Sequence, residues 1–416
     1  MILTVLIFIL ILSVLVMVHE AGHFFVAKIL KIKVEEFGFG LPPRAFGIKR
    51  GETVYSVNWL PIGGFVRLYG EDLPADALPE TLRVSMRAGT HQALQAGEAG
   101  AGSVKLKVKS PASPAGGEKL KVKDLGRAFF ARPAWQRAIV IVAGVVMNFV
   151  LAVTIISYLF SAVGVPVPGD KVFVAQVTKN SPADKAGLTK EDQILSVNNI
   201  KITSASQLVS ETRKHLGEKI TLKVKDPSFA KATAGKQRSE IRELEVTPRK
   251  VFPKTEGPMG VSVAQSVEVK KYAWYLAPFL GTMEALGQSW MILSGLGMIL
   301  YQLLFFGSVP GGVAGPVGIA QLTGQFVQVG IYAVLSFVAL LSLNLAILNI
   351  LPFPALDGGR LFFIIIEILT GKKVNQRFEG YAHAIGMAVL LGLIALITLH
   401  DIFRLVTGQP ILPQIQ

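Results

Sequence analysis

Residues 16–25, VMVHEAGHFF, decide the fold, because two histidines and a glutamate there follow a long apolar run. Residues 1–18 lack the basic start and the small-residue cleavage site of a signal peptide, so they predict a retained first transmembrane helix. Ionisable groups at membrane depth are costly and rare. We therefore expect His19, Glu20 and His23 to have a function that compensates for their burial.

The composition favours a membrane protein with one modest soluble insert. The chain has 416 residues, of which 51% are hydrophobic and 17% charged, and its mean hydropathy is +0.50. It contains no cysteine, which excludes disulfides, thiolate metal sites and cysteine nucleophiles. The net charge of +14 indicates contact with the lipid bilayer and loops that orient helices. No nucleic-acid-binding motif is present, so nucleic acid is not expected as a partner.

Four transmembrane segments are predicted from apolar runs near residues 2–25, 137–163, 331–351 and 383–403. Basic clusters at 28–50 and 372–377 should both be cytoplasmic, which places both chain termini outside. A shorter apolar patch, residues 290–306, would break this arrangement if it crossed the membrane. We therefore expect it to be interfacial or re-entrant.

The remaining segments predict β structure and a soluble insert. Residues 52–70 are rich in β-branched and aromatic residues and predict a β-hairpin or sheet rim. Residues 73–124 are poor in aromatic residues and contain KLKVK twice, which favours a flexible insertion; a basic strand pair at the membrane surface is the alternative. Residues 170–250 alternate strand-like and helix-like patterns and form the insert.

Within the insert, local signals predict individual elements. Pro182 begins a short helix that Gly187 ends, and a strand and an Asn-Asn turn follow. The stretch SASQLVSETRKHL predicts a helix with Ser204 or Ser206 as its N-cap. KITLKVKD and IRELEVTP predict strands, and the low-complexity PSFAKATAGKQR between them predicts a loop.

His19 and His23 are spaced to bind one metal ion. Four residues apart on a helix, they lie one turn apart on the same face, and neutral imidazoles suit Zn²⁺. Glu20 does not need to bind the metal; in the HExxH arrangement the metal makes a water molecule more acidic and the glutamate takes its proton. Gly22 keeps this helix slim near the site.

Asp357 is the best candidate for the third ligand that a zinc hydrolase requires. It lies in NILPFPALDGGR, residues 349–360, where Pro352 and Pro354 break a helix and two glycines oppose its restart. Broken backbone at membrane depth is tolerated only against protein or a wet cavity. The alternative is that Asp357 merely caps the following helix.

HEAGH at 19–23 together with NILPFPALDGG at 349–359 resembles the site-2 protease family of intramembrane zinc metalloproteases, peptidase family M50. The resemblance implies one Zn²⁺ per chain held by His19, His23 and Asp357, with Glu20 as the catalytic general base. It also implies substrate-binding roles for Asn349, Pro352, Pro354, Gly63 and Gly64, the two glycines belonging to a β-loop that pairs with extended substrate. The alternative for the two glycines is a simple turn.

Two further polar residues leave open alternatives. Asn148 lies inside the second predicted helix, where it either bonds across helices or approaches the active site. Glu367 either supports the site or lies near the cytoplasmic surface. SPADKAGLTKEDQILSVNNIKI, residues 181–202, makes the insert resemble a PDZ domain, which implies peptide binding or gating; a spacer without a ligand is the alternative.

The expected fold class is an α-helical polytopic membrane protein with four transmembrane helices, an interfacial helix, a membrane-associated β-hairpin and one extracytoplasmic PDZ-like α+β domain. The expected organisation is a first transmembrane helix at 1–27, a cytoplasmic-side β region at 28–72, a low-complexity insertion at 73–130, a second transmembrane helix at 131–165, the PDZ-like domain at 166–252, an extracytoplasmic linker with the interfacial helix at 253–328, a third transmembrane segment at 329–371 and a fourth transmembrane helix at 378–405.

The resemblance implies an intramembrane zinc metalloprotease of the bacterial inner membrane, with its active site near the cytoplasmic side. Its partners would be single-pass membrane proteins, such as an anti-sigma factor or signal-peptide remnants, cleaved within their transmembrane segments. One alternative is a membrane zinc transporter or sensor, which would favour more ligands along a path than the single cluster seen here. The other is an inactive PDZ scaffold, against which the intact Glu20 argues.

Overall fold

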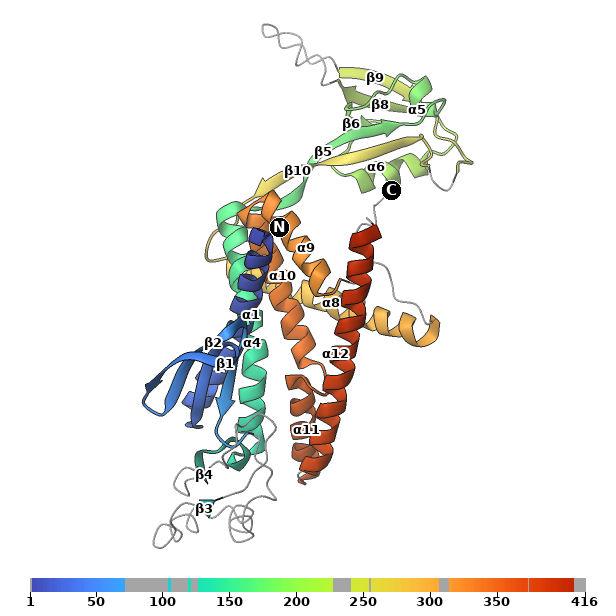
Figure 1. The fold of residues 1–416 in the computed structure, drawn as a ribbon. Coiled ribbons are helices and arrows are strands. Elements are labelled where there is room, and N and C mark those ends of the chain that lie inside the picture. The colour runs from blue at the N-terminus through green and yellow to red at the C-terminus, as the bar shows by residue number, and fades with distance from the viewer. Residues whose placement is uncertain are drawn as a thin grey trace. The chain divides into compact units, whose positions relative to one another are not determined.

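The computed structural model describes residues 2–71, 104–105, 119–120, 126–226, 241–253, 256–306, 314–372 and 374–407 (Figure 1). The chain divides into two compact units. The first joins Met1–Leu159 to Ala273–Gln416, and the second is Phe160–Tyr272. Each unit has its own buried hydrophobic cluster.

Among the described residues of the first unit, four helices are long and apolar enough to cross a membrane, as predicted. They are α1 (Ile2–Ile29), α4 (Ala134–Tyr158, continued as a wider helical turn over Leu159–Val163), α10 (Ile331–Ile350) and α12 (Gln376–Thr407). Helix α4 packs against both α1 and α10, and the three run side by side in Figure 1. The role of Gly22 is confirmed, because a Cβ there would collide with the Ala143 carbonyl of α4.

The predicted hairpin is present and begins earlier than residue 52. Strand β1 (Val34–Arg50) pairs antiparallel with β2 (Thr53–Leu68), and β2 packs along α1. Several register shifts interrupt the pairing, which is the irregularity expected where glycine and proline fall within a strand. The hairpin exposes large apolar side chains that include Phe46, Trp59 and Leu60.

The described part of the first unit also contains a short 3₁₀ turn η4 (Phe129–Ala131), α8 (Ala277–Phe306), α9 (Pro316–Val329) and α11 (Asp357–Thr370). Residues 290–306 continue α8 as one helix and expose many apolar side chains, such as Trp290, Met291 and Phe305. Their interfacial placement stays a prediction. Of the 73–124 segment, the structure describes only β3 (Val104–Lys105) paired with β4 (Lys119–Leu120). The flexible insertion and the basic strand pair at the membrane surface both stay predictions.

Within its described residues, the second unit is an antiparallel sheet with two helices. Its strands are β5 (Val165–Val177), β6 (Gln193–Val197), β7 (Ile200–Lys201), β8 (Ile220–Lys225), β9 (Ile241–Val246) and β10 (Val261–Lys270), in the order β10-β5-β6-β8-β9 with β7 beside β6. The helices are α5 (Pro182–Lys185) and α6 (Ala205–Lys214). Buried Val172, Ile194 and Leu222 anchor its core.

Local signals in this unit act as expected. The Ser204 hydroxyl caps α6 by accepting the Gln207 N–H, so Ser204 and not Ser206 is the N-cap. Gly187 follows α5 with a φ of +82°, and Asn198 and Asn199 turn the chain with positive φ. The predicted PSFAKATAGKQR loop, residues 227–238, lies outside the described residues.

Candidate metal centre

His19, His23 and Asp357 meet at one point in the first unit. Their candidate ligand atoms all lie within 4.8 Å of one another. The Asp357 Oδ2 atom is 2.8 Å from the His19 Nε2 atom and 3.2 Å from the His23 Nε2 atom, and the two Nε2 atoms are 3.1 Å apart. Both histidines are buried. The two imidazoles come from one turn of α1, while the carboxylate comes from the first residue of α11.

A backbone carbonyl fixes the orientation of His23. Its Nδ1 atom lies 2.8 Å from the Val140 carbonyl oxygen of α4. Because a carbonyl can only accept, Nδ1 carries the proton and the Nε2 lone pair faces the cluster. This arrangement is typical of metal-binding histidines, whose other nitrogen is held by an outer partner.

Gly144 of α4 provides room for both rings. A Cβ built there would lie 2.5 Å from the His23 Nε2 atom and 2.7 Å from the His19 Cε1 atom. Any side chain at this position would therefore displace the candidate ligand nitrogens. The donor set of two imidazoles and one carboxylate suits zinc and leaves a fourth position for a reactant, as in catalytic zinc sites.

A tight turn between α10 and α11 places Asp357. The chain leaves α10 at Leu351, and Ala355 adopts a φ of +87° before α11 begins. The N-cap position of α11 is Leu356, without a side-chain capping bond, and the Asp357 carboxylate faces the histidines. Asp357 is therefore not the N-cap that the alternative interpretation required.

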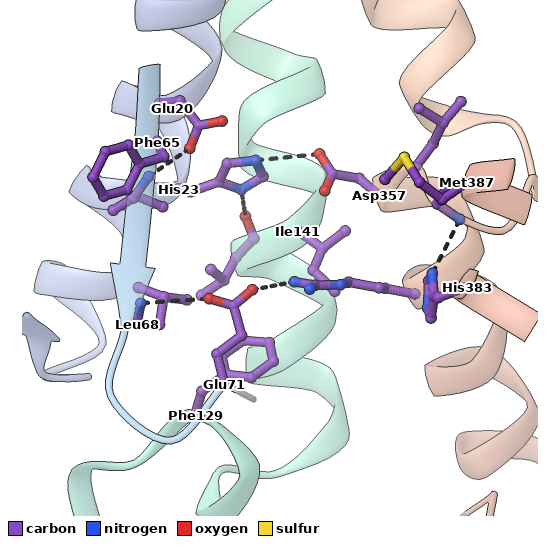
Figure 2. Close-up of a pocket in the computed structure, with 15 residues that line it drawn as sticks. Glu20, His23, Phe65, Leu68, Glu71, Phe129, Ile141, Asp357, His383 and Met387 are labelled. Atoms are coloured by element: carbon purple, nitrogen blue, oxygen red, sulfur yellow. Dashed lines mark hydrogen bonds and ion pairs between the residues drawn. The ribbon is translucent and has the colours of Figure 1, made fainter. Parts of the chain in front are cut away.

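Glu20 lies between the hairpin and the candidate metal ligands. Its Oε2 atom accepts a hydrogen bond of 3.0 Å from the Val66 N–H of β2. Glu20, His23 and Asp357 line the same cavity of about 340 Å³, and Figure 2 shows their side chains converging on it. A carboxylate so placed can exchange a proton with a reactant held at the ligands.

Among the other predicted site residues, Asn349 lies within hydrogen-bonding distance of a candidate ligand. Its Nδ2 atom is 3.4 Å from the His19 Nε2 atom. Gly63 has a φ of +76°, and a Cβ on Gly64 would lie 2.5 Å from the Met17 sulfur, so both lie where β2 approaches α1. The lining of the cavity includes neither of these glycines nor the two prolines of the turn, Pro352 and Pro354. The lining residues from these two segments include Phe65, Val66, Ala355 and Leu356.

The structure also brings in residues that sequence reasoning left undecided or missed. The Asn148 side-chain amide lies against His19, with its nitrogen 3.4 Å from the Nδ1 atom, so this residue meets α1 across the helix interface and also reaches the site. Glu367 instead pairs with Arg137 of α4 at 2.6 Å. An ion pair between Glu71 and Arg360 borders the cavity (Figure 2), and no local pattern in the sequence signalled it.

A helix-borne HExxH pair completed by a distant carboxylate, in a chain with four candidate membrane spans, defines a polytopic membrane metalloprotease. The sequence pattern of peptidase family M50 matches residues 7–393. The chain belongs to peptidase family M50, and the resemblance read from its two motifs is confirmed.

Individual relatives agree with this assignment over nearly their whole length. The chain is 32% identical to the zinc metalloprotease RasP of Geobacillus kaustophilus, over 95% of this chain and 96% of the relative. It is 31% identical to the regulator of sigma-W protease RasP of Bacillus subtilis, over 97% of this chain and 99% of that protein. A putative zinc metalloprotease of Clostridium acetobutylicum is 28% identical over 94% of each chain.

Proposed function

We propose that this protein hydrolyses a peptide bond within the transmembrane segment of a single-pass membrane protein. The observation that carries the proposal is the position of the metal cluster. His19, Glu20 and His23 belong to the candidate span Leu3–Ile29, which contains an 18-residue window of mean hydropathy 2.5, and both histidines are buried. Ionisable groups at this depth mark functional sites because their burial is otherwise unfavourable.

His19, His23 and Asp357 would hold the zinc ion, and Glu20 would act as the general base. When bound, zinc supplies Lewis acidity, which favours deprotonation of water at neutral pH and polarises a carbonyl. The Glu20 carboxylate, oriented by the Val66 N–H, takes the proton of the attacking water and returns it to the leaving amine. The Asn349 amide, beside His19, is placed to donate to a substrate carbonyl.

The substrate must be extended to be cut, because a helix hides its amides in its own hydrogen bonds. Inside a membrane these freed groups need partners. Strand β2 passes beside Glu20 and can pair with an extended segment, with Gly63 and Gly64 permitting close backbone approach. Pro352 and Pro354 hold open the break that leads to Asp357.

The second unit is proposed to be a PDZ-like domain outside the cytoplasm that binds or filters substrates. The supporting observation is an antiparallel sheet with α5 and α6 beside it in the same unit. The PDZ-like stretch, residues 181–202, forms α5, β6 and β7, and α6 comes next along the chain. The compact unit extends to Tyr272 and includes β10, beyond the expected end at 252. This role rests on the fold alone.

The proposed setting is a bacterial inner membrane, with the active site near the cytoplasmic side. The substrate class would be an anti-sigma factor or a signal-peptide remnant. The name of the Bacillus subtilis relative, a regulator of sigma-W protease, supports the first of these. Within the described residues, His19, His23 and Asp357 form the one cluster suited to a metal, which disfavours a transporter with ligands along a path.

The test uses purified protein in detergent with a tagged transmembrane substrate. Glu20→Gln should abolish cleavage and leave zinc content unchanged, because the substitution removes the base and no ligand. Native protein stripped of zinc and then reloaded is the control for metal dependence. Undiminished cleavage by Glu20→Gln would contradict the proposal, and zinc binding without any cleavage by the native protein would favour a sensor.

A further inference from the structure

We propose that His383 of α12 is a positioning residue of the metal centre, because it holds the turn that carries Asp357. Its Nδ1 atom accepts a hydrogen bond of 3.0 Å from the Ala355 N–H, as Figure 2 shows for the bond at His383. Ala355 lies two residues before Asp357. The inference rests on the proposed role of Asp357 as a ligand and assigns a contribution to the fourth transmembrane helix.

The turn needs an external partner at this point. Ala355 has a φ of +87°, a conformation that is unfavourable for a residue with a side chain and persists only when its surroundings fix it. An unpaired backbone N–H at membrane depth adds a further penalty. The imidazole of His383 therefore satisfies the donor and fixes the strained residue at once.

Helix α12 is shaped to bring the imidazole to this turn. Gly386 lies three residues after His383, on the same face of the helix. A Cβ on Gly386 would lie within 2.6 Å of the Pro354 side chain and would collide with the Pro354 carbonyl, so only glycine permits this approach. His383 also packs against Phe363 of α11, with ring centroids 5.9 Å apart, and so contacts both sides of Asp357.

The hydrogen-bonding state of His383 fits this role. Because Nδ1 accepts from Ala355, the proton of the neutral ring is on Nε2. The Nε2 atom is buried and has no hydrogen-bond partner within the described part of the chain, and the nearest carboxylate, of Glu379, is 3.9 Å away. Among the described residues, the bond from the Ala355 N–H is thus the one hydrogen bond that this ring makes.

Three substitutions at His383 separate the effect of its hydrogen bond from the effect of its side-chain volume. His383→Leu removes the acceptor, His383→Asn places an amide oxygen near the former Nδ1 position, and His383→Gln places one near Nε2 instead. Zinc release to a chelator and the kcat and KM for a transmembrane substrate are measured for each, with the exposed His400 of the same helix changed to Leu as the control.

We expect zinc release from His383→Leu and His383→Gln to be roughly 10-fold faster, the lower end of the range for direct outer partners of metal ligands because His383 acts through the Ala355 backbone, with kcat reduced and KM little changed. His383→Asn and His400→Leu should resemble the native protein. Native-like zinc release from His383→Leu would overturn the inference, as would His383→Asn behaving like His383→Gln. If His383→Leu does not fold, the comparison of Asn with Gln decides. Failure of the native protein to bind zinc would instead refute the proposed function.

Discussion

Gly144→Ala should disturb the metal centre, because it adds a methyl group directly against both histidine rings. The new Cβ would lie 2.5 Å from the His23 Nε2 atom and 2.7 Å from the His19 Cε1 atom. Ordinary van der Waals contact begins at 3.4 Å, so the ring of His23 must retreat by about 0.9 Å. Its Nδ1 bond to the Val140 carbonyl restrains that movement.

The expected cost follows from this displacement. Forcing a methyl group into a packed interior typically costs about 1–3 kcal/mol, and here the strain falls on the ligands. Expressed as zinc affinity, that range is a loss of roughly 5- to 150-fold. A ligand misplaced by about 1 Å can also lower the catalytic rate on the order of 100-fold.

The assay is zinc competition against a chromogenic chelator, followed by cleavage of a transmembrane substrate at saturating zinc. Gly392→Ala is the matched control, because Gly392 lies in a candidate span and a Cβ there meets nothing within 4 Å. Zinc affinity of Gly144→Ala within twofold of this control would refute the reasoning that Gly144 is kept small to make room for the ligands.

Two other substitutions test the surroundings of the site and the hairpin. Asn148→Leu should lower zinc affinity roughly 10- to 100-fold, because the Asn148 amide lies against the Nδ1 side of His19. Unchanged affinity in the chelator assay would show that Asn148 contributes only packing. The Arg127 guanidinium, followed by the Lys28 ammonium, lowers the pKa of Glu52 from 4.5 to about 2. The stability from this pair is present above pH 4.5 and is lost as the pH falls towards 2. Glu52→Gln should therefore lower the free energy of unfolding at pH 7 by about 1 kcal/mol or less, because the pair is screened by solvent, and should leave it unchanged at pH 2; thermal melts at the two pH values measure this. Equal differences at both pH values would contradict this assignment.

The ligand cluster could be predicted because its parts carry strong local signals. The spacing of His19 and His23 fixes their shared face on a helix, and their burial in an apolar run demands compensation. Asp357 stood out because prolines and glycines break the helix around it. These signals depend on neighbours in the chain, and the structure brings the three side chains together.

The outer contacts of the site could not be predicted in this way. Asn148 and His19 are 129 positions apart, and His383 and Ala355 are 28 apart. No periodicity within one helix indicates which residue of another helix it will meet. A polar residue inside an apolar segment was the only available signal, and for Asn148 it left two alternatives open.

Strand β1 falls within the β region expected at 28–72, but the hairpin itself was predicted only from residue 52, for a different reason. The sequence of Val34–Arg50 contains three glycines and the pair Pro42-Pro43, residues that usually argue against a strand. Pairing with β2 overrides this preference, since the register shifts accommodate the irregular residues. At Gly38 the absence of a side chain makes room for the Phe65 ring, which would otherwise lie 2.5 Å from a Cβ.

The most direct test of the central claim, that Asp357 completes a zinc site begun by His19 and His23, is the metal content of purified protein in detergent. Native protein and Glu20→Gln should each contain about one zinc per chain after dialysis, whereas Asp357→Asn should lose nearly all of it. Thermal melts of each variant confirm that the comparison is made between folded proteins. Full zinc content in folded Asp357→Asn would contradict the account.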